Sequence, residues 1–139
     1  MCIRDSLGPE VQIAQPFDAA LARVRAALKA EGFGILTEID LQQAFREKLG
    51  REFRPYVILG ACNPPLAYAA VAADPQVGLL LPCNVTVEGL GPGTSVVRLT
   101  DPEVLLGASA GGGIPALRDI ARDAGARLAR VAAVLREES

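Results

Sequence analysis

The chain contains no histidine and no tryptophan, and only 4% of its residues are aromatic. Without histidine, the Ser-His-Asp and Cys-His catalytic arrangements are excluded, and so is every zinc site that uses a histidine ligand. With so few aromatic residues, any core has to be packed from small aliphatic side chains. Half of the 139 residues are hydrophobic, which is enough to form such a core and disfavours disorder.

The chain also lacks a strong charge of either sign and a long apolar run. Its 14 basic and 16 acidic residues give a net charge of −2 at pH 7, which argues against a nucleic-acid partner. No apolar run reaches the roughly 18–20 residues that span a bilayer, and the start shows no secretory leader pattern. We therefore expect a cytoplasmic protein that binds neither nucleic acid nor membrane.

The length is typical of a single domain. Residues 1–10 have no relation to the patterns that follow, so we expect them to be disordered or artefactual. A single α+β domain is then placed at residues 11–139.

Hydrophobic periodicity and end signals predict four helices and five strands. Asp40 with Gln43 forms a capping-box pattern, and Asn63-Pro64 is typical of a helix start. The predicted helices span 17–31, 41–49, 64–73 and 115 to near the end, and the predicted strands span 11–14, 33–39, 53–61, 77–87 and 94–100.

The elements alternate as in a parallel α/β protein, but three features favour an antiparallel sheet. Residues 88–93 are a Gly-rich turn between the last two strands, which predicts a hairpin. Pro55 and Pro82 fit poorly in a buried parallel sheet, and Pro82 inside a strand predicts an edge or a bulge. No Gly-rich nucleotide-binding fingerprint is present. The sequence therefore predicts an α+β fold, with helices mainly on one face of an antiparallel sheet and a long C-terminal helix.

Three blocks of the sequence stand out: residues 29–40 (KAEGFGILTEID), 53–64 (FRPYVILGACNP) and 78–85 (GLLLPCNV). In this order they resemble the family catalogued as domain of unknown function 302, over residues 17–135. The resemblance implies a fold like that of the TATA-binding protein, with a curved antiparallel sheet, and a tendency to form homodimers. It does not imply DNA binding, because fold does not fix function. The glycine-rich stretch 109–113 departs from the family pattern.

Two Cys-Asn pairs, Cys62-Asn63 and Cys83-Asn84, form the candidate functional site. If the strands that carry them are neighbours, the two sulfur atoms approach each other. Cys62 precedes a helix, and a helix N-terminus lowers the pKa of a nearby thiol. The competing interpretation is structural, because a cysteine in an apolar context is usually a small packing residue and Asn63 is accounted for as a helix cap.

Three functions are compatible with this site. The first is binding of a small ligand near Cys62, Asn63, Cys83, Asn84 and Glu38. The second is thiol redox chemistry or binding of Cu(I) by Cys62 and Cys83, because soft sulfur ligands select soft metals; Glu38 is a candidate additional ligand. The third is a non-catalytic, homodimeric interaction protein. An enzyme is the weakest hypothesis, because no general base is evident near the thiols.

Overall fold

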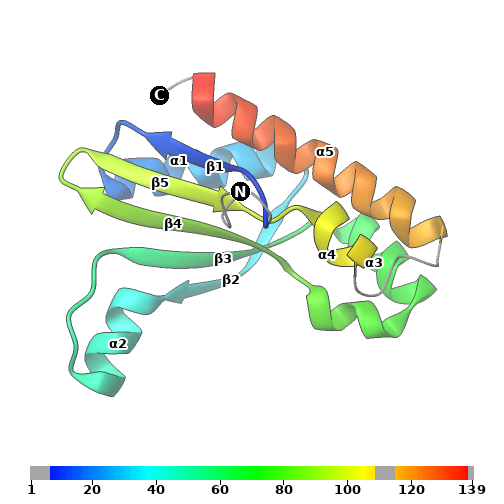
Figure 1. Ribbon diagram of the computed structural model, residues 1–139, viewed down its shortest axis with the longest axis horizontal. Coiled ribbons are helices and arrows are strands. Elements are labelled where there is room, and N and C mark those ends of the chain that lie inside the picture. The colour runs from blue at the N-terminus through cyan, green and yellow to red at the C-terminus, as the bar shows by residue number, and fades with distance from the viewer. Residues whose placement is uncertain (1–6, 109–114, 138–139) are drawn as a thin grey trace.

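The computed structural model describes residues 7–108 and 115–137, and its centre is a five-stranded antiparallel sheet (Figure 1). The strand order is β1-β5-β4-β3-β2, and every neighbouring pair runs antiparallel. The predicted antiparallel α+β fold is therefore confirmed, including the hairpin of the last two strands. The strands are β1 (Glu10–Ile13), β2 (Gly34–Asp40), β3 (Tyr56–Cys62), β4 (Cys83–Gly91) and β5 (Thr94–Leu99).

Two long helices cover one face of the sheet, and the shorter helices gather at its ends (Figure 1). The longest, α5, confirms the predicted C-terminal helix. In the described part of the chain, no helix is both long and apolar enough to cross a bilayer. The helices are α1 (Phe17–Ala30), α2 (Leu41–Leu49), α3 (Pro64–Ala73), α4 (Pro102–Ala108) and α5 (Pro115–Glu137), with a 3₁₀ helix, η2 (Pro75–Leu80).

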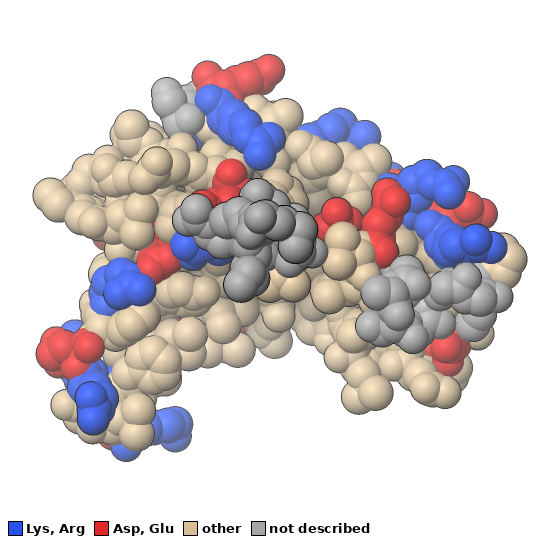
Figure 2. Space-filling view, viewed as in Figure 1, with Lys and Arg blue, Asp and Glu red and all other residues tan. Residues whose placement is uncertain are grey.

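The helix-end signals in the sequence act as expected. The Asp40 carboxylate accepts a hydrogen bond from the Gln43 backbone N–H at the start of α2. Gly50 ends the same helix in the left-handed conformation, with φ of 62°, which a residue with a Cβ adopts only at a cost. Charged side chains of both signs lie close together around α2 and along α5 (Figure 2), as expected for solvated helix faces.

The core forms where alternate residues of the strands meet α1 and α5. Val57 and Leu59 in β3, and Val85 and Val87 in β4, are buried on this face. Strand geometry turns the residues between them toward the opposite face of the sheet. Burying each such side chain contributes about 1.5–3 kcal/mol. The same cluster includes Val11, Ile13, Val97 and Leu99 from β1 and β5, Val24 and Leu28 from α1, and Leu128, Val131 and Leu135 from α5.

The structure differs from the prediction most clearly at residues 77–87, which were expected to be one strand. The first part is the 3₁₀ helix η2, and β4 starts only at Cys83, after a cis peptide bond before Pro82. Two contacts account for the helical turn. The Asp74 carboxylate accepts a hydrogen bond from the Gln76 N–H, and Val77 is buried in a second apolar cluster with α3 and α5. Pro82 therefore precedes a central strand instead of marking an edge or a bulge.

The domain begins slightly earlier than the expected boundary at residue 11. Glu10 already belongs to β1. The carbonyl of Leu7 accepts a hydrogen bond from the N–H of Asp101, and that of Pro9 from the N–H of Leu99. Residues 1–6, the remainder of the expected terminal segment, lie outside the described residues, as does the glycine-rich stretch 109–113.

Gly60 in β3 lies so close to its neighbours that an added side chain would overlap with them. A Cβ added there would collide with the Thr37 hydroxyl and lie 2.8 Å from Cγ of Pro82. We predict that Gly60→Ala lowers the free energy of unfolding by about 1–3 kcal/mol through overpacking, measured by urea denaturation. Gly78→Ala is the matched control, because a Cβ at Gly78 meets nothing within 4 Å. An equal effect of both substitutions would contradict the close packing at Gly60.

Candidate functional site

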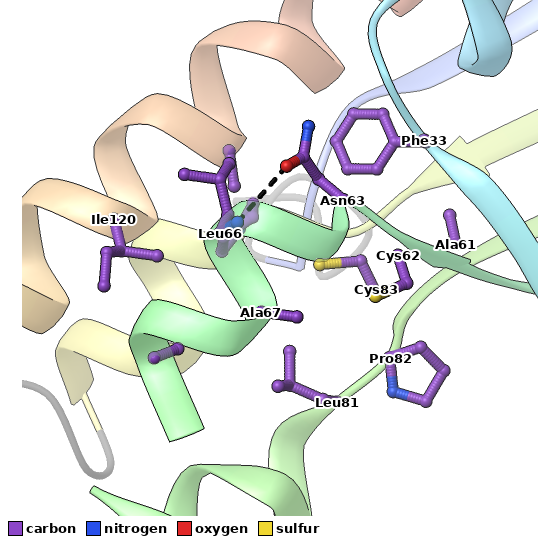
Figure 3. Close-up of a pocket in the computed structure, with 13 residues that line it drawn as sticks. Phe33, Ala61, Cys62, Asn63, Leu66, Ala67, Leu81, Pro82, Cys83 and Ile120 are labelled. Atoms are coloured by element: carbon purple, nitrogen blue, oxygen red, sulfur yellow. Dashed lines mark hydrogen bonds between the residues drawn. The ribbon is translucent and has the colours of Figure 1, made fainter. Parts of the chain in front are cut away.

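The pairing of β3 with β4 brings the two cysteines together. Cys62 is the last residue of β3 and Cys83 the first of β4, and Ala61 lies opposite Cys83 in the antiparallel register. Both cysteines are free thiols and both line one pocket. Figure 3 shows their sulfur atoms close together inside it. The neighbouring strands and converging thiols expected from the sequence are therefore present.

The pocket around the thiols is small and apolar. Its volume is about 40 Å³, room for roughly two or three water-sized groups. Side chains from α3, α5 and the segment before β4 form its walls (Figure 3). The apolar lining residues are Phe33, Ala61, Leu66, Ala67, Ala70, Leu81, Pro82, Pro102, Ile120 and Ala124. Such a site fits an ion or a few atoms better than an organic molecule.

Asn63 lines the same pocket, but its side chain has a structural role. Its side-chain oxygen accepts a hydrogen bond from the Leu66 N–H at 3.3 Å (Figure 3), so it is the N-cap of α3, as its sequence position predicted. A capping side chain of this kind contributes about 0.5–2 kcal/mol to stability. Asn63 thereby determines where α3 starts and where the wall formed by Leu66 lies.

Two of the five candidate residues lie away from this pocket. Asn84 faces the other side of the sheet, because successive strand residues point to opposite faces, and it lines a different groove. Glu38 lies on the edge strand β2, where it pairs with Arg25 at an exposed position. Of the five predicted ligand-binding residues, only Cys62, Asn63 and Cys83 therefore line the same pocket. Strand alternation alone was sufficient to separate Asn84 from Cys83.

Burial dominates the electrostatics of the thiols. It raises the pKa of Cys62 above its ordinary value. The pKa of Cys83 rises to about 11, first through burial and second through the nearby charge of a Cys62 thiolate. The expectation that the helix N-terminus lowers the pKa of Cys62 is therefore wrong. Cys62 precedes the cap residue and lies against apolar side chains, so burial penalises its thiolate form.

The pocket can supply two sulfur ligands and no more. Across residues 7–108 and 115–137, no three His, Cys, Asp or Glu side chains come together as a metal site. The apolar walls of the pocket have one signal in the sequence, the helically spaced apolar residues of the C-terminal helix, which include Ile120. Such spacing is equally typical of a residue in the core, so it does not indicate a pocket.

Comparison with known proteins gives one consistent result. The model of the family described as "Domain of unknown function DUF302" matches residues 10–135. The crystal structure of an uncharacterised conserved DUF302 protein from Bacillus stearothermophilus superposes with a TM-score of 0.81 at 32% sequence identity. The similarity covers 94% of this chain and 98% of that one. No curated protein matches the chain.

The raised pKa of Cys83 couples protein stability to pH. The pKa is about 11 in the folded protein, against an ordinary value of 9.0, so folding favours the neutral thiol. This contribution is complete below about pH 9, is lost as the pH rises to about 11, and is on the order of 2 kcal/mol. We predict that the free energy of unfolding falls more steeply over this window in the wild type than in Cys83→Ala.

Urea denaturation at about pH 8 and about pH 10.5 measures the two slopes. The contributions of all groups that the two proteins share cancel in the comparison. Parallel losses of stability in the two proteins would mean that the Cys83 thiol is not buried as described.

Proposed function

The chain belongs to the DUF302 family of domains of unknown function, and from its paired thiols we propose that it binds a single Cu(I) ion between Cys62 and Cys83. The observation that supports this most strongly is that two sulfur atoms share one small apolar pocket. Thiolate sulfur selects soft metal ions, of which Cu(I) is one. Two sulfur ligands fall short of the four that a closed structural zinc site uses.

The size of the pocket favours an ion over an organic ligand. A volume of about 40 Å³ is far below the roughly 300–1,000 Å³ of sites that hold small molecules. Both cysteines are partly exposed, and the apolar walls around them lower the local dielectric, which strengthens the bonds between an ion and the thiolates.

The raised pKa values disfavour thiol exchange at neutral pH. The thiolate is the attacking species in disulfide exchange, so a thiol with a pKa of about 11 reacts slowly at neutral pH. A bound cation instead displaces the thiol protons and stabilises both thiolates. Such a site requires reduced thiols, which a cytoplasmic location provides.

The chain has a third cysteine, Cys2, which is replaced by serine so that only the two pocket thiols remain. We predict that this Cys2→Ser background protein binds one Cu(I) per chain. Adding Cys62→Ser or Cys83→Ser is expected to weaken Cu(I) binding by more than about 100-fold, which exceeds the usual effect of substitutions outside the ligand shell. Competition with a chromophoric Cu(I) chelator under anaerobic conditions measures the affinity, and X-ray absorption counts the sulfur ligands. Since binding displaces protons, the affinity in the background protein rises between about pH 6 and pH 8.

Cys2→Ser alone is the matched control, because it leaves both pocket thiols in place. Cu(I) affinity that survives the loss of Cys83, or an ion with no sulfur ligands, would refute the two-thiol site. Circular dichroism of each variant confirms that lost affinity does not reflect lost structure.

A homodimeric interaction protein is the second candidate, supported by the edge of the sheet formed by β2 and α2. No residue of α2 is buried. Leu36 and Ile39 in β2 are 66% and 47% exposed, and Leu49 at the end of α2 is 64% exposed. β2 is also an outer strand of the sheet, and outer strands with apolar side chains pair readily with another chain. A second copy meeting this edge would bury all three side chains.

We predict that the double substitution Leu36→Glu/Ile39→Glu weakens self-association by about 100-fold or more, since it places charges inside a buried interface. Sedimentation equilibrium measures the dimer dissociation constant. Leu79→Glu is the control, because Leu79 is 88% exposed and lies in η2, at the other end of the molecule (Figure 1). A monomeric wild type, or a dimer unaffected by the double substitution, would exclude this edge as the interface.

A further inference from the structure

The strand register brings Cys62 and Cys83 within reach of a covalent bond. Ala61 lies directly opposite Cys83, so Cys62 is displaced from Cys83 by one residue along the strand. With about 4.8 Å between neighbouring strands and about 3.3 Å of rise per residue, the Cα atoms of the two cysteines lie about 6 Å apart. Cysteines that share a disulfide have Cα atoms roughly 4.4–6.8 Å apart.

The side chains of the two cysteines also point to the same place. Residues displaced by one position on neighbouring strands ordinarily face opposite sides of a sheet. Cys62 is the last residue of β3, however, where the chain leaves the sheet for α3, and it lines the same pocket as Cys83. Figure 3 shows the two sulfur atoms side by side. The charge of a Cys62 thiolate also contributes to the raised pKa of Cys83, which requires the two groups to be neighbours.

A small molecule can reach the sulfur atoms. Both cysteines are partly exposed, and the pocket volume of about 40 Å³ holds roughly two or three water-sized groups. Hydrogen peroxide is scarcely larger than such a group, whereas an organic disulfide such as oxidised glutathione is far too large to enter. The oxidant that suits this pocket is therefore a small, uncharged hydroperoxide.

We propose that Cys62 and Cys83 form a redox switch, which hydrogen peroxide closes into a disulfide and a thiol reductant reopens. The Cys62 sulfur attacks one peroxide oxygen and breaks the O–O bond; it becomes a sulfenic acid, and the other oxygen leaves with the thiol proton as water. The Cys83 sulfur then attacks the Cys62 sulfur, and the sulfenic hydroxyl leaves with the Cys83 proton as a second water. The two thiols together lose two electrons, which reduce one peroxide to two waters.

Cys62 is the attacking group in this sequence and Cys83 the resolving one. The thiolate is the nucleophile in such reactions, and Cys83, with a pKa of about 11, supplies very little thiolate at neutral pH. Because burial raises the pKa of Cys62 as well, the first step is slow, and the pair stays reduced until the peroxide concentration is sustained.

The disulfide has two consequences for the protein. It abolishes the Cu(I) site, since neither sulfur is then a thiolate; this consequence rests on the Cu(I) binding proposed above, whereas the disulfide itself does not. The bond also closes a loop over residues 62–83, which contains α3 and η2, and a closed loop destabilises the unfolded chain. The oxidised protein is therefore expected to unfold at a higher urea concentration than the reduced protein.

Mass spectrometry of the full-length Cys2→Ser protein tests the disulfide. After treatment with hydrogen peroxide under native conditions, the intact mass is expected to fall by that of two hydrogen atoms. Proteolysis is expected to release two peptides joined through Cys62 and Cys83, and dithiothreitol to restore the original mass. Cys62→Ser and Cys83→Ser in the same background are the matched controls, in which this loss of mass is absent. Oxygen added to either sulfur without a disulfide, disulfides only between chains, or thiols that react only after unfolding would overturn the proposal.

Cu(I) binding by the two redox forms separates this switch from the Cu(I) site itself. In the chelator competition, the oxidised protein is expected to bind Cu(I) at least about 100-fold more weakly than the reduced protein, with full recovery after reduction. If the reduced protein binds no Cu(I), the Cu(I) proposal fails, while the mass measurement still decides whether the disulfide forms. Equal Cu(I) binding by both forms would overturn the link between the disulfide and the ion.

Discussion

The antiparallel pairing of β3 with β4 is the constraint on which the cysteine pocket depends. Its register places Ala61 opposite Cys83 and Gly60 opposite Asn84. Because side chains alternate between the faces of a strand, this one register places Cys83 in the cysteine pocket and Asn84 in the groove on the other face. A shift of one residue would exchange the two faces and remove Cys83 from the cysteine pocket.

The packing around the cysteines gives them their chemical character. Small aliphatic side chains from α3 and α5 approach closely and leave a pocket of only about 40 Å³. In such surroundings a thiolate without a cation is unstable, which is the reason that burial raises the pKa of both cysteines. The Cu(I) ion proposed for this pocket would offset one of the two thiolate charges.

Local signals predicted much of the fold. The caps at Asp40 and Asn63 act through bonds to residues three positions away, so the sequence contains the whole interaction. The residues that form η2 are different. Leu79, Leu80 and Leu81 have the composition of a strand, but the cap at Asp74 and the burial of Val77 against α3 and α5 favour a helical turn. The second of these contacts spans distant parts of the chain and is invisible to local periodicity.

The sequence by itself determined the α+β class, the antiparallel sheet, the ends of α2 and α3 and the family resemblance, because each rests on short-range patterns of side chains. It also identified both cysteines. Only the tertiary structure decided that Cys62 and Cys83 share a pocket while Asn84 and Glu38 do not. It alone revealed the groove over Thr86 and Arg98. Both outcomes depend on strand register and on helices packed from distant parts of the chain, and desolvation in the assembled pocket then reversed the expected shift in the pKa of Cys62.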